Sequence, residues 1–195
     1  METEKMKAKA GKLYDANYDE ELLKEREVCA DLTYELNHLR PSQVHERKEL
    51  LRRILGKTKK DFIIISPFFC DYGYNIEVGE NFFMNMNCVI LDGAKVTFGD
   101  NVFIAPNCGF YSAGHPLDVE QRNQGLEYAY PITVGNNVWI GAHVSVLPGV
   151  TIGDNTVIGA GSVVTKDIPA NVLAVGNPCR VVRVLTEADR EKYRK

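Results

Sequence analysis

Residues 134–169 read "VGNNVWIGAHVSVLPGVTIGDNTVIGAGSVVTKDIP" and divide into six consecutive hexapeptides. Each hexapeptide begins with valine or isoleucine: Val134, Ile140, Val146, Ile152, Ile158 and Val164. A period of six fits neither an α-helix (about 3.6) nor a simple alternating strand (about 2), but it fits a short strand followed by a tight turn. Stacked turns of this kind bury a continuous column of aliphatic side chains, which no single hexapeptide buries alone.

The same spacing starts earlier in the chain, at Tyr72, Val78, Met84 and Ile90, and resumes after a two-residue shift at Phe98, Ile104 and Phe110. From Phe110 to Val134 the frame is kept over 24 residues. Residues 112–131 nevertheless lack the aliphatic position and are polar, with Gln121, Arg122, Asn123, Gln124 and Glu127. We therefore expect residues of about 112–131 to leave the column as an extruded loop on a rigid scaffold.

The first part of the chain has helical periodicity instead. Asp19 is a candidate N-cap, and one helical face follows it: Leu22, Cys29, Leu32, Leu36 and Leu39. Pro41 interrupts this pattern, and a second helix is expected from about Ser42. The apolar faces must pack on the rest of the chain or on a neighbouring subunit. The predicted organisation is a helical segment over 1–60, a repeat domain over 61–185 and a tail over 186–195.

Composition narrows the classes of partner and location. The net charge of −3 is spread over mixed charges, which argues against nonspecific binding to nucleic acid or to an anionic membrane. No apolar run approaches the ~18 residues that span a bilayer. The start, "METEKMKAKAGKLYD", lacks the apolar core of a signal peptide. The five cysteines form no CxxC pair, which favours reduced thiols and predicts a cytoplasmic protein.

Several segments together resemble one family, the hexapeptide-repeat acetyltransferases, and within it the maltose and galactoside O-acetyltransferase branch. They are "GKLYD", "CDYGYNIEVGENFFMNMN", "GDNVFIAPN", "GHPLD", "PITVGNNVWIGAHV" and "VVTKDIPANVLAVGNPCRV". The resemblance implies a mainly β fold: a left-handed parallel β-helix of hexapeptide repeats with an N-terminal helical segment and an extruded loop. It also implies transfer of an acetyl group from acetyl-CoA to a sugar hydroxyl, by a homotrimer with its sites between subunits.

His115 lies in the loop motif "GHPLD". Histidine titrates near neutral pH, so it can take a proton from a hydroxyl and return it to a thiolate leaving group. In the resembling enzymes a histidine at this position activates the acceptor for direct attack on the acetyl thioester, without an acyl-enzyme. We therefore predict that His115 is the general base; the alternative is a ring that only caps a turn beside Pro116.

The resemblance also implies acceptor-binding residues, Asn85, Asp71 and Asp92. For Asn85 the alternative is a turn residue or part of an asparagine ladder. The galactoside enzymes carry serine where Asp71 stands and an acidic residue where Gly93 stands. This departure favours maltose- or glucose-type acceptors over galactosides.

For the coenzyme, the resemblance implies small residues along one edge, an indole and three basic side chains. These are Trp139, Ala142, Ala160, Thr165, Lys166, Arg180 and Arg183, and a backbone N–H near Ala142 is the candidate oxyanion donor. Only His115 and His143 lie in the repeat region, so one chain cannot build a zinc site from three histidines there, and no metal is predicted.

Two other functions remain open from the sequence. The same fold and coenzyme can serve another acceptor, such as an antibiotic or an oligosaccharide. The repeats can also form a noncatalytic scaffold that binds ligands or partners. Binding of acetyl-CoA separates the scaffold from both enzymes.

Overall fold

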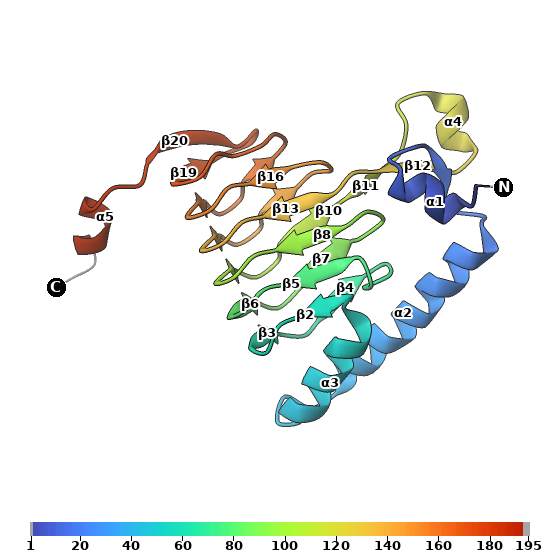
Figure 1. The fold of residues 1–195 in the computed structure, drawn as a ribbon, viewed down its shortest axis with the longest axis horizontal. Coiled ribbons are helices and arrows are strands. Elements are labelled where there is room, and N and C mark those ends of the chain that lie inside the picture. The colour runs from blue at the N-terminus through green and yellow to red at the C-terminus, as the bar shows by residue number, and fades with distance from the viewer. Residues whose placement is uncertain (1, 193–195) are drawn as a thin grey trace.

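The structure is a computed structural model that describes residues 2–192. Figure 1 shows stacked coils of short strands with helices at the N-terminal end. The strands of the coils form three faces, and within each face successive coils pair as parallel strands. The first face contains β4 (Phe68–Cys70), β7 (Cys88–Leu91), β10 (Gly109–Tyr111), β15 (Ser145–Val146) and β18 (Val163–Val164). The second contains β2 (Lys57–Thr58), β5 (Ile76–Val78), β8 (Val96–Phe98), β13 (Ile132–Val134) and β16 (Thr151–Ile152).

The third face contains β3 (Phe62–Ile64), β6 (Phe82–Met84), β9 (Phe103–Ile104), β14 (Trp139–Ile140), β17 (Val157–Ile158) and β19 (Val172–Val175). Only β20 (Arg180–Val184) pairs antiparallel there, against β19, before the short α5 (Ala188–Glu191). The predicted mainly β fold, a parallel β-helix of hexapeptide repeats, is confirmed.

The strand register shows two coil lengths. Partners on the first face are 20 residues apart in the early coils (Phe68 with Cys88) and 18 apart in the late coils (Ser145 with Val163). Across the polar loop the spacing is 36 residues, Gly109 with Ser145, which is two late coils. The frame is kept because the extruded loop has the length of one coil.

The predicted aliphatic column forms the core. All six hexapeptide positions from Val134 to Val164 are buried. The early coils also bury aromatic side chains: the ring centroid of Phe98 lies 5.1 Å from that of Phe82 and 4.9 Å from that of Phe110. The longer coils therefore enclose larger side chains than the later coils of valine and isoleucine.

Asparagines hold one corner of the prism, between the second and third faces. Asn81, Asn101, Asn137, Asn155 and Asn171 have φ between 54° and 61°, in the left-handed region that asparagine tolerates. The Nδ2 of each of the first four donates to the Oδ1 of the asparagine in the next coil, at 2.9–3.1 Å. The ladder satisfies these amides and fixes the turns of successive coils.

The N-terminal helices pack at one end and along one side of the prism. They are α1 (Glu4–Lys9), α2 (Glu20–His38) and α3 (Val44–Ile54). The Asp19 side chain accepts from the Leu22 N–H at 3.0 Å, which confirms the predicted N-cap. Leu36, Leu51 and Ile54 belong to the same hydrophobic core as the strands. The helices thus pack on their own chain, and within residues 2–192 we find no helix of the length and apolarity that a bilayer crossing needs.

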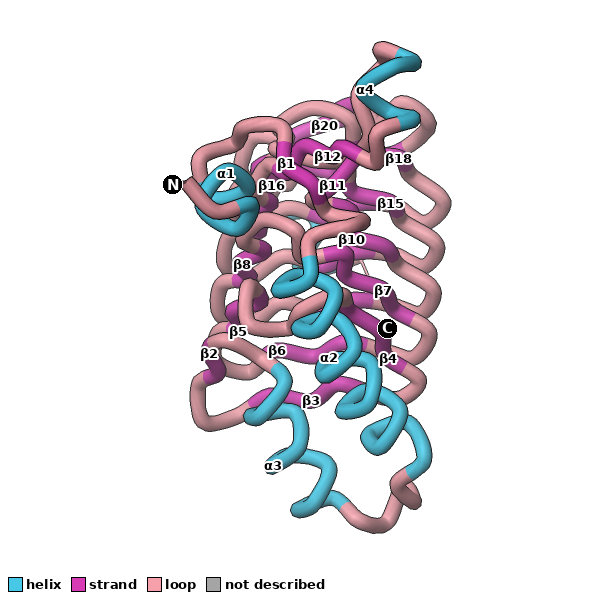
Figure 2. The backbone as a smooth tube through the Cα atoms, turned by 90° about the vertical axis from the view of Figure 1, so that its right-hand side faces the viewer, coloured by secondary structure: helices cyan, strands magenta, loops and turns pink. Residues whose placement is uncertain are grey.

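The extruded loop is tied to the start of the chain. It contains β11 (Ala113–Gly114), α4 (Val119–Asn123) and β12 (Leu126–Ala129). A separate three-stranded sheet runs β1–β12–β11, with β1 at Tyr14–Asp15. Figure 2 shows these three strands together beside α1, with α4 at the outer tip of the loop. The N-terminal segment therefore braces the loop that carries His115.

Candidate active site

A backbone carbonyl of the neighbouring strand orients the ring of His115. The residue follows β11, and its Nδ1 lies 3.0 Å from the carbonyl oxygen of Leu126 in β12. Leu126 in turn pairs with Asp15 of β1. A carbonyl only accepts hydrogen bonds, so in the neutral imidazole Nδ1 carries the proton and Nε2 keeps its lone pair. The ring is therefore held in the tautomer that a general base requires, with its side chain 49% exposed.

Glu127 faces the free nitrogen of His115. Its Oε1 lies 3.8 Å from His115 Nε2, and its side chain is mostly buried. Tyr14 donates to Glu127 Oε2 at 3.3 Å, and Asn17 donates to Oε1 at 3.4 Å. A carboxylate at this place stabilises the imidazolium that forms when the histidine takes a proton. From the sequence, Glu127 is recognisable only as a polar loop residue, because Tyr14 and Asn17 lie more than 100 residues away along the chain.

These groups surround a cavity of about 240 Å³. Its polar walls come from three parts of the chain: Tyr14, Arg26, Asp71, Tyr72, His115 and Glu127. Arg26 belongs to α2, and its guanidinium donates to the carbonyl of Ala16. No motif in the sequence pointed to Arg26. It comes near His115 only because α2 packs beside the loop in the folded chain. Its carboxylates, phenols, imidazole and guanidinium can form hydrogen bonds with a bound polar molecule.

Asp71, which the sequence predicts to bind the acceptor, lines this cavity. Burial raises its pKa to about 6, the nearby charge of Asp92 adds to the shift, and Arg26 opposes it. The ionised carboxylate accepts hydrogen bonds, which suits ligand hydroxyl groups.

Asp92 lies behind the cavity wall and not in it. The side chain is fully buried, and burial raises its pKa to about 6. Its Oδ1 accepts from the N–H of Asp71 at 3.1 Å and of Tyr72 at 2.9 Å, and its Oδ2 from that of Asn75 at 3.3 Å. Asp92 thus holds the turn that carries Asp71 and Tyr72 through backbone hydrogen bonds. Its carboxylate is not among the groups that line the cavity.

We expect Asp71→Asn to stabilise the protein above pH 7. The pKa of Asp71 is about 6 when folded against an ordinary 3.8, so the folded chain binds more protons between these values. Stability therefore falls as pH rises from about 4 to about 6 and stays at the lower level above. Removing the charge should restore on the order of 1–3 kcal/mol at pH 8 and much less at pH 4.5. Thermal melts at both pH values measure this.

The matched control for that prediction is Asp31→Asn. Asp31 is an exposed aspartate on α2. Its substitution should leave the melting temperature nearly unchanged at both pH values. A melting temperature of Asp71→Asn that is lower than that of the wild type at pH 8 would contradict the assigned burial cost.

The predicted site residues fall on two different edges of the prism. His115, Asp71, Thr165 and Lys166 lie at the loop edge, between the first and second faces. The Asn85 edge, between the third and first faces, carries Asn85, Ala142 and Ala160, with Trp139 beside it in β14. The width of the first face separates the two edges. Its longest strand has four residues, which corresponds to about 13 Å at about 3.3 Å per residue. One chain does not bring the two groups together. The expectation that Ala142, Ala160 and Thr165 line a single edge is wrong, because Thr165 follows a strand of the first face and the two alanines follow strands of the third.

The outer side of the third face is apolar. Residues in register across its strands are Ile63, Phe83, Phe103, Trp139, Val157 and Leu173. Trp139 is 56% exposed although it is the largest of them. The matching outer positions of the second face are polar: Glu77, Thr97, Thr133 and Thr151. The third face therefore carries an exposed apolar column that the second face lacks, and large exposed apolar patches are typical of interaction surfaces.

The two arginines predicted near the coenzyme lie in β20, at the C-terminal end. Arg180 donates to the carbonyl of Cys179 at 2.8 Å. Arg183 forms a salt bridge with Asp189, with one contact at 2.8 Å, and this holds the pKa of Asp189 well below its usual range. In residues 2–192 there is no group of three or more histidine, cysteine, aspartate or glutamate side chains placed to hold a metal ion.

Comparisons with known proteins show which family this chain is similar to. Residues 7–59 match the maltose acetyltransferase hexapeptide capping motif, and residues 131–166 match the bacterial transferase hexapeptide model of six repeats. The galactoside O-acetyltransferase of Escherichia coli (strain K12) is 48% identical over 185 residues, which cover 95% of this chain and 91% of that protein.

Two solved structures are also similar over nearly the whole chain. A galactoside acetyltransferase in complex with coenzyme A has a TM-score of 0.93 at 48% identity, covering 97% of this chain and 94% of that one. A maltose O-acetyltransferase from Clostridium difficile 630 has a TM-score of 0.92 at 53% identity, covering 95% and 98%. The chain therefore belongs to the hexapeptide-repeat acetyltransferases, in the branch of the maltose and galactoside O-acetyltransferases.

Proposed function

We propose that this acetyltransferase moves an acetyl group from acetyl-CoA directly to a hydroxyl of a sugar of the maltose, glucose or galactoside type. One observation carries the proposal: His115 is locked by Leu126 in the tautomer of a base, and its free Nε2 lies beside Glu127 at a polar cavity. The coenzyme A complex of the similar galactoside acetyltransferase supports acetyl-CoA as the donor.

The reaction follows from this geometry. A sugar hydroxyl gives its proton to His115 Nε2 while its oxygen attacks the thioester carbonyl, so that a tetrahedral oxyanion forms. The carbon–sulfur bond then breaks, and the imidazolium returns the proton to the departing thiolate. Glu127 stabilises the imidazolium between these two steps. No acyl-enzyme and no metal take part.

The oxyanion needs a hydrogen-bond donor, and the corner at Ala142 supplies one. Gly141 donates its N–H to the carbonyl of Ile158 at 2.8 Å, and His143 donates to that of Pro106 at 3.1 Å. Among the backbone hydrogen bonds of residues 2–192, none uses the N–H of Ala142, which lies between these two. A free backbone N–H at the Asn85 edge suits a developing oxyanion regardless of the side chain.

The site is complete only when two chains meet, and we infer a homotrimer. The apolar column on the third face supports a subunit contact, and the division of site residues over two edges supports sites between subunits. In this assembly His115 and Asp71 come from one subunit, and Asn85, Trp139, Ala142 and Ala160 from its neighbour. Thr165, Lys166, Arg180 and Arg183 would hold the rest of the coenzyme. All five cysteines are free thiols, which supports a cytoplasmic location.

A coupled assay of thiol release tests the function. We expect release that depends on both acetyl-CoA and a sugar, with maltose and glucose compared with galactosides. Release with an antibiotic or an oligosaccharide but with none of these sugars would favour the alternative acceptor. If isothermal titration detects no binding at millimolar acetyl-CoA, the protein is a scaffold and the proposal fails.

Glu127→Gln should lower kcat for sugar acetylation by about tenfold, because a neutral amide stabilises the imidazolium less than a carboxylate does. The amide oxygen can still accept from Tyr14, so the fold should be retained. Steady-state kinetics with acetyl-CoA varied should give an unchanged KM for the coenzyme. Glu120→Gln, an exposed substitution on α4 in the same loop, is the control and should retain the wild-type rate. An unchanged kcat in Glu127→Gln would remove this residue from the mechanism.

A further inference from the structure

One buried hydroxyl has no hydrogen-bond partner. Among the buried side-chain nitrogen and oxygen atoms of residues 2–192, only the hydroxyl oxygen of Tyr72 lacks one. The residue is 7% exposed. A buried hydroxyl without a partner lowers the stability of the folded protein, and phenylalanine would fill the same space without that cost. The hydroxyl therefore needs an explanation outside the packing of the free chain.

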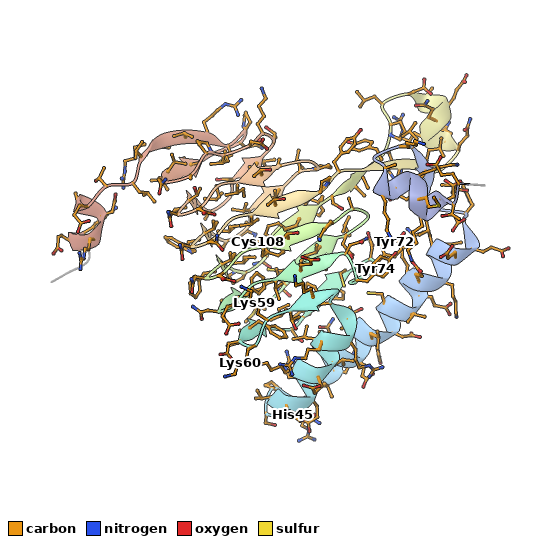
Figure 3. All side chains as sticks on the ribbon, in the orientation of Figure 1. His45, Lys59, Lys60, Tyr72, Tyr74 and Cys108 are labelled. Atoms are coloured by element: carbon orange, nitrogen blue, oxygen red, sulfur yellow. The ribbon has the colours of Figure 1, made fainter. Side chains whose placement is uncertain are left out.

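Tyr72 is held firmly in the wall of the active-site cavity. Its backbone N–H donates to buried Asp92, so the turn that carries it is fixed. Its side chain packs in a small apolar cluster with Tyr14, Leu22 and Ala129. Figure 3 shows Tyr72 and Tyr74 between the prism and the N-terminal helices. Tyr72 lines the same cavity as Asp71 and His115.

We propose that the Tyr72 hydroxyl binds the sugar acceptor and forms its hydrogen bond only when the cavity is occupied. This inference rests on the proposed function. A carboxylate only accepts hydrogen bonds, whereas a phenol also donates. One sugar hydroxyl can therefore donate to Asp71 and accept from Tyr72, while a different hydroxyl of the same sugar faces His115. Asp71 and Tyr72 together therefore select polyols that have a hydroxyl positioned between these two side chains.

Arg26 lines the cavity beside the ring of Tyr72 and donates to the carbonyl of Ala16. The guanidinium carbon of Arg26 lies 6.0 Å from the centroid of the Tyr72 ring, and the side chain is long and flexible. The competing explanation is a water molecule in the neighbouring gap of about 10 Å³, lined by Tyr14, Tyr72 and Tyr74. A gap of that size is at the lower limit for one water. A water would satisfy the hydroxyl with and without sugar.

Tyr72→Phe and Tyr74→Phe form a matched pair for the test. The Tyr74 hydroxyl donates to Glu25 at 2.7 Å, so its removal breaks a satisfied bond. We expect Tyr72→Phe to keep or raise the melting temperature and to lower acceptor kcat/KM about tenfold, with the KM for acetyl-CoA unchanged. Tyr74→Phe should lower the melting temperature and keep acceptor kcat/KM.

A panel of monodeoxy sugars identifies the bond itself. For the sugar that lacks the partner hydroxyl, Tyr72→Phe and the wild type should have equal kcat/KM, while the other sugars keep the tenfold difference. An unchanged acceptor kcat/KM in Tyr72→Phe, or a melting temperature that drops as in Tyr74→Phe, overturns the inference and favours the bound water. Failure of the proposed function is a distinct result, because then the wild type itself releases no thiol with any sugar.

Discussion

His115→Ala should lower kcat for sugar acetylation by about 10²–10⁴, the usual contribution of a positioned general base. Without the imidazole the acceptor hydroxyl must attack with its proton in place, and the thiolate leaves without a proton donor. Binding of acetyl-CoA should stay within about twofold of wild type, because the proposed coenzyme contacts lie on other residues. Thiol-release kinetics give the rates, and isothermal titration gives the coenzyme affinity.

His45→Ala is the control for that loss. His45 is exposed on α3 at the far end of the molecule from the loop, as Figure 3 shows. Its removal should leave the rate unchanged. A rate above about one tenth of wild type in His115→Ala would contradict a general base at this position.

The fold was accessible from the sequence because the hexapeptide period is local. An aliphatic residue every six positions marks the buried column directly, and the 24-residue interval from Phe110 to Val134 showed that the loop keeps the frame. The asparagine ladder was harder to predict. Asn81 and Asn101 are 20 residues apart, but Asn101 and Asn137 are 36 apart, so the ladder becomes visible only once the coils are stacked.

The site was only partly accessible, for the same reason. His115 stands in a recognisable loop motif and Asp71 in a recognisable turn. The residues that act on them come from elsewhere: Tyr14 and Arg26 lie in the N-terminal segment, which no repeat pattern connects to the loop. Asp92 was predicted to contact the acceptor, but only the fold reveals that its carboxylate is enclosed by backbone N–H groups. Motifs identify residue types, whereas their orientation depends on long-range packing.

Two inactive variants should restore activity to each other if each site is shared between subunits. His115→Ala leaves the Asn85 edge intact, and Asn85→Ala leaves the loop edge intact. In oligomers refolded together at equal amounts, a site works when an intact His115 from one chain meets an intact Asn85 from the next. Random mixing makes this true for about a quarter of the sites, so about 25% of wild-type activity should return. Thiol-release assays of the refolded mixture measure it.

The control for a shared site is a mixture of the same two variants that are combined only after each has folded. Subunits that do not exchange cannot combine their edges, so the second mixture should show only the sum of the two residual rates. Ala142→Arg blocks the Asn85 edge with a large side chain. Refolded with His115→Ala in place of Asn85→Ala, it should restore the same fraction of activity. If each chain held a whole site, every refolded mixture would stay at the residual rate, because each chain would carry one defect. That result would exclude the shared site, however well the subunits associate.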